Sequence, residues 1–204
     1  MKQNKSSAVM AQRNRADNGS LDFFPTPPWA TRALMEHVIK GSWQGYTCLE
    51  PACGEGHMAR PLREYFGSVT ASDIHDYGYG DVADFLLKGH HFSHDWVITN
   101  PPFNRAEEFI YSAQKIATVG VAMLVRTAFL ESVGRYNRIF RDSPPTTIGI
   151  FSERVPMLKG RLDRKASTAT SYCWLVWQKA LAHGSRVTWI PPCRKRLERD
   201  EDYD

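Results

Sequence analysis

The regular alternation of short apolar runs with amphipathic segments constrains the fold of this chain more than any other feature. Apolar runs of about four to eight residues are typical of strands, whereas apolar residues that recur every three or four positions are typical of helices. The sequence predicts helices over 28–39, 58–66, 106–117 and 129–140, and strands over 46–49, 68–72, 95–99, 120–125 and 146–151. Strands that alternate with helices in this way form a parallel sheet covered on both faces.

The alternation stops in the last third of the chain. Residues 153–169 contain Pro156 and Gly160 and show no period, so we expect a long loop there. Two more strands are expected over 171–178 and 186–190, and the short link between them permits antiparallel pairing only. We therefore predict a single-domain α/β fold with a mostly parallel, doubly wound, seven-stranded sheet and a C-terminal antiparallel hairpin.

The length of the chain limits the number of domains, because 204 residues are enough for about one. Its apolar fraction of 42% and charged fraction of 24% are typical of a folded globular protein. No run approaches the roughly 18 apolar residues of a membrane helix. We expect a mobile basic arm over 1–20, the folded domain over 21–192 and a charged tail over 193–204.

Cysteine usage and charge indicate the compartment and the class of partner. The four cysteines form no Cys-x-x-Cys pair, which favours free thiols in a reducing cytoplasm. A net charge of +4 permits nucleic-acid binding without requiring it. The basic excess in the loop expected over 153–169 offers candidate phosphate contacts, and a solvated basic loop is the alternative. These candidates are Arg154, Lys159, Arg161, Arg164 and Lys165.

A glycine-rich turn follows the first predicted strand. Gly54, Gly56 and Ala59 fit the pattern G-x-G-x-x-G/A, and Asp73 follows at the end of the second strand. Such glycines let the backbone approach a ligand, and the acid accepts hydrogen bonds from ribose hydroxyls. The sequence therefore predicts a site for an adenosine-containing cofactor, with a tight turn that binds no ligand as the alternative.

The charges around this turn bear on which cofactor it binds. Glu50 and Glu55 flank the glycines, and negative charge disfavours a pyrophosphate at this position. Acidic residues suit the ammonium and sulfonium of S-adenosylmethionine, which we prefer over a nicotinamide dinucleotide. Tyr111 and Lys115 have the spacing of a dehydrogenase pair, but they lie opposite the apolar stripe of the helix predicted over 106–117.

Asn100-Pro101-Pro102-Phe103, here called the 100–103 tetrapeptide, directly follows the strand predicted over 95–99. The prolines keep the chain extended, so the Asn100 amide oxygen and the Pro101 carbonyl can face one point outside the sheet. The Phe103 ring offers a stacking surface beside them. Two acceptors and a ring face suit a planar group with an exocyclic NH2, and a rigid turn is the alternative.

Together these segments, from about Asp22 to Ile190, resemble S-adenosylmethionine-dependent DNA adenine-N6 methyltransferases, in particular the small prophage-encoded enzymes. The resemblance implies a Rossmann-like class I methyltransferase fold and catalysis by the 100–103 tetrapeptide. It also implies a cofactor site in which Phe24, Thr26 and Pro27 contact the methionine carboxylate and Glu50 faces the amino group. The resemblance completes that site with the loop residues Pro51, Ala52, Gly54 and Gly56, with Asp73 and Ile74 at the ribose, with Asp84 and Phe85 at the adenine, and with Asn100.

Two departures from the family pattern affect the nucleic-acid side of the predicted site. Family members place an aromatic residue against the extruded base, where this chain has Met157. The length also leaves no room for a separate target-recognition domain, so loop 153–169 would read a short or relaxed target. A base in duplex DNA must leave the stack to react.

Alternatives remain at this point. An RNA methyltransferase of adenine N6 or guanine N2 with the same site stays open. Guanine-N2 methyltransferases of ribosomal RNA share the tetrapeptide, but usually with His where Asn104 stands. Methyltransferases of a glutamine amide carry a helical domain that is not seen before Leu21. A non-catalytic nucleic-acid or partner-binding protein is the alternative from another class. We predict direct in-line methyl transfer to adenine N6 in DNA, without metal or membrane. His90-His91-Phe92-Ser93-His94 matches no common zinc spacing.

Overall fold

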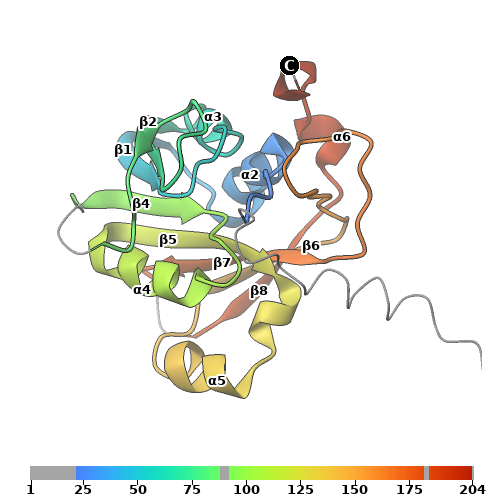
Figure 1. The fold of residues 1–204 in the computed structure, drawn as a ribbon. Coiled ribbons are helices and arrows are strands. Elements are labelled where there is room, and N and C mark those ends of the chain that lie inside the picture. The colour runs from blue at the N-terminus through green and yellow to red at the C-terminus, as the bar shows by residue number, and fades with distance from the viewer. Residues whose placement is uncertain (1–21, 88–91, 182–183, 204) are drawn as a thin grey trace, which may run out of the picture.

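The computed structural model describes residues 22–87, 92–181 and 184–203, so the arm expected over 1–20 lies outside the described residues (Figure 1). One eight-stranded sheet runs through the molecule in the order β3-β2-β1-β4-β5-β7-β6-β8. The strands are β1 (Trp43–Glu50), β2 (Phe66–Asp73), β3 (Asp81–Val82), β4 (His94–Thr99), β5 (Ala117–Arg126), β6 (Thr147–Phe151), β7 (Tyr172–Gln178) and β8 (Arg186–Ile190).

The pairing of these strands confirms the predicted fold class. β1 to β5 pair in parallel with one another, and β7 runs antiparallel to both β5 and β6. The sheet is therefore mostly parallel with an antiparallel element near the C-terminus. It has eight strands rather than the seven predicted, because the two-residue β3 adds an edge beside β2.

The partner of β7 differs from the expected one. We predicted that β7 and β8 would pair as a hairpin, but β6 lies between them and pairs in parallel with β8. Burial explains this order. All residues of β7 except the last are buried, so β7 needs a neighbour on each edge, whereas β8 is mostly exposed and suits the edge of a sheet.

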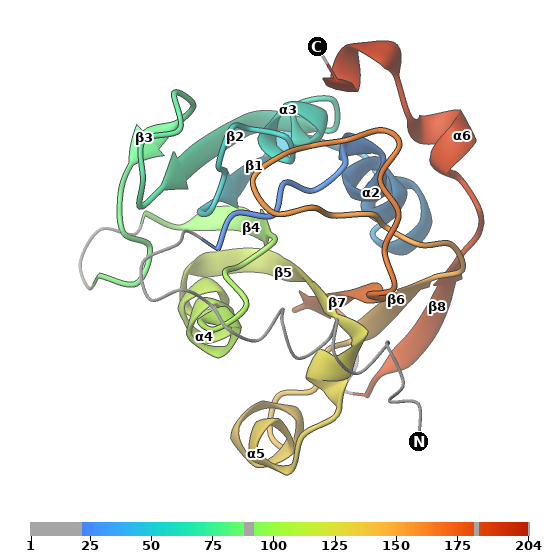
Figure 2. The same cartoon turned by 45° about the vertical axis from the view of Figure 1, so that its right-hand side comes forward.

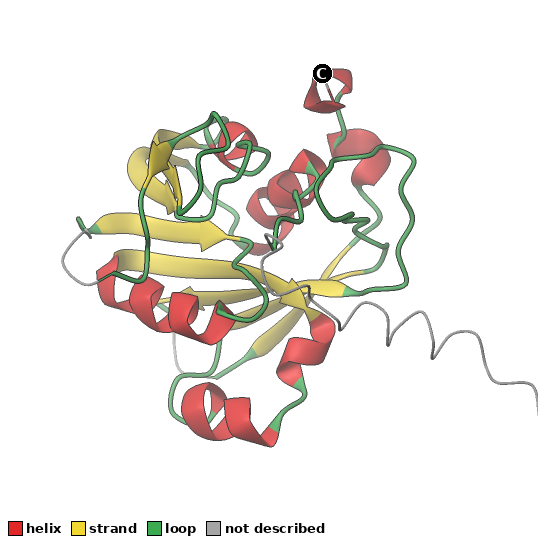
Figure 3. Ribbon diagram, in the orientation of Figure 1, coloured by secondary structure: helices red, strands yellow, loops and turns green. Residues whose placement is uncertain are grey.

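Helices cover both faces of the sheet (Figure 3). One face holds α2 (Pro28–Ala33), which continues as a π-helix (Leu34–Val38), with α3 (Ala59–Leu62) and α6 (Arg194–Leu197). The other face holds α4 (Ala106–Ile116) and the region of α5 (Val133–Arg135). Along β5, Ala122 and Leu124 pack toward the first layer and Val121 and Met123 toward the second, as expected for a strand buried on both faces.

Two predicted helices are shorter or more broken than the sequence indicated. Only Ala59–Leu62 is helical within 58–66, because β2 begins at Phe66. The segment 129–140 is divided into a 3-10 helix (Thr127–Leu130), α5 and a π-helix (Tyr136–Phe140). The Ser132 hydroxyl accepts a hydrogen bond from the Arg135 backbone N–H and so starts a new helix within the apolar pattern.

The segment expected as a charged tail, 193–204, contains α6 and a 3-10 helix (Asp200–Tyr203), and α6 lies beside α2 (Figure 2). Arg32 of α2 is only 3% exposed and forms ion pairs of 2.8 Å with both Asp202 and Glu64. Its guanidinium also donates to the Leu197 carbonyl at 2.8 Å. The end of the chain is thus joined to α2 by a buried ionic cluster.

The cysteines and helix lengths bear on two further expectations. All four cysteines are buried and free, as expected from their spacing. Among the described residues, none of the helices has the length and apolar character needed to cross a membrane.

Candidate active site

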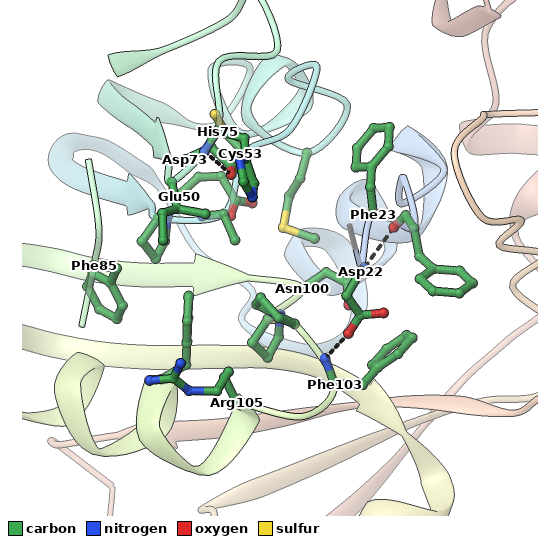
Figure 4. Close-up of a pocket in the computed structure, with 18 of the residues that line it drawn as sticks. Asp22, Phe23, Glu50, Cys53, Asp73, His75, Phe85, Asn100, Phe103 and Arg105 are labelled. Atoms are coloured by element: carbon green, nitrogen blue, oxygen red, sulfur yellow. Dashed lines mark hydrogen bonds between the residues drawn. The ribbon is translucent and has the colours of Figure 1, made fainter. Parts of the chain in front are cut away.

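A cavity of about 450 Å³ lies beyond the carboxyl ends of β1, β2 and β4. This edge is where open α/β sheets bind their ligands. Figure 4 shows Glu50 and Asp73 on one side of the cavity and Asn100 and Phe103 toward the other. Predicted site residues in its wall are Phe24, Thr26, Glu50, Pro51, Ala52, Asp73, Ile74, Asp84, Phe85, Asn100, Pro101, Pro102 and Phe103.

The glycine turn follows β1 and is hydrogen-bonded to Asp73 at the end of β2. The Gly54 backbone N–H donates to Asp73 Oδ2 at 2.9 Å, and the His75 N–H donates to Oδ1 at 3.1 Å. Gly54 has a φ of +48°, and a Cβ there would lie 2.4 Å from Cε2 of Phe23. Only glycine fits this close approach. Gly54, Gly56 and Pro27 are not part of the cavity wall, so the glycines shape the site from behind.

Glu50 ends β1 and is 1% exposed. Burial raises the pKa of its carboxyl group to about 8, although hydrogen bonds from Thr99 and Ala52 act in the opposite direction. Both bonds reach Oε1, which leaves Oε2 without a hydrogen-bond partner in the part of the chain that the structure describes. A cation at Oε2 would favour the ionised carboxylate and would compensate its burial.

The wall near β3 is apolar. Phe85 is buried against Phe109 of α4, with ring centroids 5.0 Å apart, and Ile74 is half exposed at the cavity edge. Asp84 Oδ1 accepts the Leu86 backbone N–H at 2.8 Å and fixes the turn that carries Phe85. Apolar side chains with a few polar groups are typical of a pocket for a planar ring.

Asn100 follows β4 and faces the segment that precedes α2. Its Nδ2 donates to the Phe24 carbonyl at 3.0 Å. Because a carbonyl can only accept, this bond fixes the amide orientation. Oδ1 is buried and has no partner among residues 22–87, 92–181 and 184–203. Since buried acceptors are nearly always paired, this oxygen marks a position for a donor that the protein does not supply.

Phe103 is anchored by a hydrogen bond from its backbone N–H, and other side chains contact its ring. Its N–H donates to Asp22 Oδ2 at 2.7 Å (Figure 4), and its ring lies 5.1 Å from that of Phe24. The guanidinium of Arg126 lies 4.0 Å from the ring centroid. We expected Phe103 to offer a stacking surface; in the structure Arg126 stacks on it.

The predicted nucleic-acid residues are only partly brought to the cavity. Met157 is buried with Sδ 3.7 Å from Asn100 Nδ2 and 3.8 Å from Thr26 Oγ1, so it lies beside the 100–103 tetrapeptide. Arg161 and Arg164 instead form ion pairs with Asp163 and Asp200 at 3.5 and 2.7 Å.

The remaining basic candidates are exposed. The Arg154 guanidinium donates to the Ser171 hydroxyl, and Lys159 and Lys165 lie on the surface of the loop. Of the histidine cluster, His90 and His91 lie outside the described residues. Within the described ranges, no group of three or more His, Cys, Asp or Glu side chains is arranged to hold a metal ion.

The comparisons with known proteins rest on structure. No family model matches the sequence, and no curated protein matches it. A solved structure from Vibrio vulnificus, described as a modification subunit of a type I restriction enzyme, superposes with a TM-score of 0.61 at 16% identity. The match covers 98% of this chain and 53% of that one, so the chain spans about half the length of that subunit.

Two more solved structures cover most of this chain. One from Listeria monocytogenes is described as a class I S-adenosylmethionine-dependent methyltransferase, with a TM-score of 0.57, 12% identity and coverage of 92% of this chain and 71% of that one. One from Pyrococcus horikoshii is described as an RNA methyltransferase, with a TM-score of 0.56 and 15% identity. That match covers 87% of this chain and 99% of the other. The chain has the class I methyltransferase fold.

Sequence reasoning missed several residues that this fold brings to the cavity. Asp22, Phe23, His75, Tyr77 and Arg105 all lie in its wall. Phe23 and Tyr77 have ring centroids 4.7 Å apart, so they pair across the loop that follows β2. The position of Phe23 next to Phe24 was a usable signal, whereas nothing local in the sequence marked Asp22 or Arg105.

Proposed function

We propose that this chain transfers a methyl group from S-adenosylmethionine to the exocyclic N6 amine of adenine in DNA. The observation that carries the proposal is the buried, unpartnered Oδ1 of Asn100 at the carboxyl end of β4. The Phe24 carbonyl holds the other end of the amide, so the side chain presents a fixed acceptor. An exocyclic NH2 group supplies the missing donor.

The charges of the cavity fit the proposed cofactor. The free Oε2 of buried Glu50 suits the ammonium of the methionine portion, and Asp73, which ends β2, suits the ribose hydroxyls. Phe85 and Ile74 provide the apolar wall for the adenine. S-adenosylmethionine supplies an activated methyl group on a positively charged sulfur.

The 100–103 tetrapeptide would act on the acceptor amine. The lone pair of that nitrogen is delocalised into the base, so the amine is a weak nucleophile. Hydrogen bonds from the NH2 to Asn100 Oδ1 and the Pro101 carbonyl draw the nitrogen toward a pyramidal geometry and stabilise its developing positive charge. With the cofactor bound, the N–C bond would form in line as the C–S bond breaks, the sulfonium would leave as a neutral thioether, and the nitrogen would pass its proton to water.

Two observations support a nucleic-acid substrate. Solved structures with the same fold include one described as a restriction-enzyme modification subunit and one described as an RNA methyltransferase. A basic residue, Arg126, also lies over the ring of Phe103 in the cavity wall. The resemblance of the tetrapeptide and of segment 24–27 to DNA adenine-N6 enzymes favours DNA over RNA.

The experiment that tests the proposal identifies the methylated nucleoside. The protein is incubated with methyl-labelled S-adenosylmethionine and separate pools of duplex DNA, single-stranded DNA and RNA, which are then digested to nucleosides. We expect the label in N6-methyldeoxyadenosine. Label in a methylated ribonucleoside would move the activity to RNA, and no label in any pool would contradict the proposal.

A further inference from the structure

Arg126 is a charged residue beside the tetrapeptide to which the proposed reaction assigns no role. It is the last residue of β5, and Thr99, which ends β4, pairs with Met123 on the same strand. β4 and β5 therefore leave the sheet side by side, which brings Arg126 level with the tetrapeptide. Its guanidinium stacks on Phe103 at 4.0 Å from the ring centroid.

The guanidinium of Arg126 has no anionic partner in the described part of the chain. Its Nε is buried and makes no hydrogen bond, and no described carboxylate lies within the 4.0 Å of an ion pair. Other arginines of the protein do have a carboxylate partner: Arg105 pairs with Glu108 at 2.6 Å, and Arg138 pairs with Glu107 at 2.8 Å. A half-buried cation without a counter-charge is unfavourable unless a ligand supplies one.

The guanidinium itself indicates the chemistry of that ligand. It lies over the Phe103 ring, and its N–H donors point outward in its own plane, where they match two oxygens of a phosphate. A second arginine is close in the fold. Tyr172 is the strand partner of Arg126, and the preceding Ser171 binds the Arg154 side chain, which likewise lacks a described carboxylate partner.

We infer that Arg126 binds a backbone phosphate of the acceptor nucleic acid, next to the base that the tetrapeptide holds. This inference rests on the proposed function, because it needs a nucleic-acid acceptor at this cavity. Stacking on Phe103 positions the guanidinium, and the phosphate provides the counter-charge that the protein lacks. Arg126 is thus a substrate-binding residue, not a group that acts on the methyl.

The test is the salt dependence of binding to a fluorescent single-stranded oligonucleotide, measured by anisotropy over a series of NaCl concentrations. Each phosphate contact to single-stranded nucleic acid contributes about 0.7 to the slope of log K against log salt. We expect Arg126→Gln to lower the slope magnitude by about that amount and Arg126→Lys to retain it.

The matched control is Arg186→Gln. Arg186 also lacks a described carboxylate partner, but it bonds Thr147 Oγ1 at 3.0 Å at the start of β8. It should leave the slope unchanged. Thermal unfolding of each variant checks that it is folded, and Arg126→Met reports on packing against Phe103, because it keeps an apolar side chain without charge.

The outcomes separate this inference from the proposed function. An unchanged slope for Arg126→Gln, an equal loss in Arg126→Lys, an equal loss in Arg186→Gln, or failure of the wild type to bind the oligonucleotide would overturn the role of Arg126. If Arg126→Gln lowers the slope as expected but the wild type methylates no nucleic acid, the proposed function is contradicted and the phosphate contact still stands.

Discussion

The side of the cavity that we propose for the cofactor and the side that we propose for the acceptor are built in different ways. On the cofactor side, buried carboxylates are held by backbone N–H groups, as where Gly54 and His75 both donate to Asp73. On the acceptor side, some exposed cations of loop 153–169 pair with the protein's own acids, as where Arg164 binds Asp200. Hydrogen bonds from the backbone therefore fix the carboxylates of the cofactor side, whereas Arg164 must give up Asp200 before it can bind a phosphate.

This difference predicts that the two sides can be disabled separately. Backbone-anchored groups lose function when the local geometry changes, whereas surface cations contribute small and salt-dependent increments. The predictions below test that separation, beginning with the substitution expected to have the largest effect.

The largest effect is expected for Asn100→Ala. Loss of the fixed acceptor should lower kcat for methyl transfer by roughly 10²–10³-fold, as for loss of a single oxyanion-type contact. The Kd for S-adenosylmethionine, measured by calorimetry, should stay near the wild-type value because Glu50 and Asp73 are untouched. The matched control is Asn104→Ala in the same cavity wall. Equal methylation by both variants would remove Asn100 from the mechanism.

Gly54→Ala should damage the cofactor side directly. The added Cβ would lie 2.4 Å from Phe23 Cε2 in a backbone that already has a φ of +48°. We expect cofactor affinity to fall by more than roughly tenfold, which corresponds to about 1.4 kcal/mol. Gly78→Ala isolates the clash, because Gly78 has a φ of +74° but no atom within 4 Å of its Cβ position. Comparable losses in both variants would mean that backbone strain, not Phe23, matters.

Glu50 should make cofactor binding and stability depend on pH in opposite directions. Its carboxyl pKa is raised from 4.5 to about 8 in the folded protein. The free energy of unfolding should therefore fall as pH rises from 4.5 toward 8, because the folded state retains a proton that the unfolded state has lost. An ammonium prefers the ionised form, so cofactor affinity should rise roughly tenfold per pH unit below the pKa.

Urea denaturation and calorimetry between pH 5 and pH 8 measure these two trends. Glu50→Gln carries no titrating proton at this position, so its free energy of unfolding should vary less with pH over this range. Its cofactor affinity should no longer rise with pH. A wild type whose cofactor affinity does not change with pH would argue against an ammonium at Glu50.

The smallest effects are expected in the basic loop. Arg154 is held by a hydroxyl, whereas Arg164 must give up Asp200 before it can bind a phosphate. Arg154→Gln should weaken oligonucleotide binding by roughly threefold, and Arg164→Gln by less, because an exposed ion pair is worth only about 0–1 kcal/mol. Anisotropy at fixed salt provides the measurement. A larger loss for Arg164→Gln would show that its ion pair opens readily.

The sequence predicted the fold where local pattern decides it. The runs at 95–99 and 120–125 became β4 and β5 because the first has an apolar centre, Trp96 to Ile98, and the second is apolar throughout. The neighbours of β7 were not predictable in this way. Proximity in sequence favoured β8, but the choice of β6 depends on burying both edges of a strand, which is a property of the whole sheet.

The candidate site shows the same limit. The glycine turn and the tetrapeptide are local motifs, so both could be recognised in the sequence. The bond from Asn100 to Phe24 and the stacking of Arg126 on Phe103 join residues far apart in the chain. The pairing of Arg164 with Asp200 was equally hidden, because charge counts do not show which acid a base will meet.

The buried cluster around Arg32 links the far end of the chain to the cavity. α2 starts directly after the Phe24–Pro27 segment, and Arg32 within it is held by Asp202 and by the Leu197 carbonyl. Protein engineering near residue 200, such as a fused tag or a trimmed terminus, would therefore disturb the helix that directly follows the cavity-lining segment 24–27. Fusions to this protein are better inserted elsewhere on its surface.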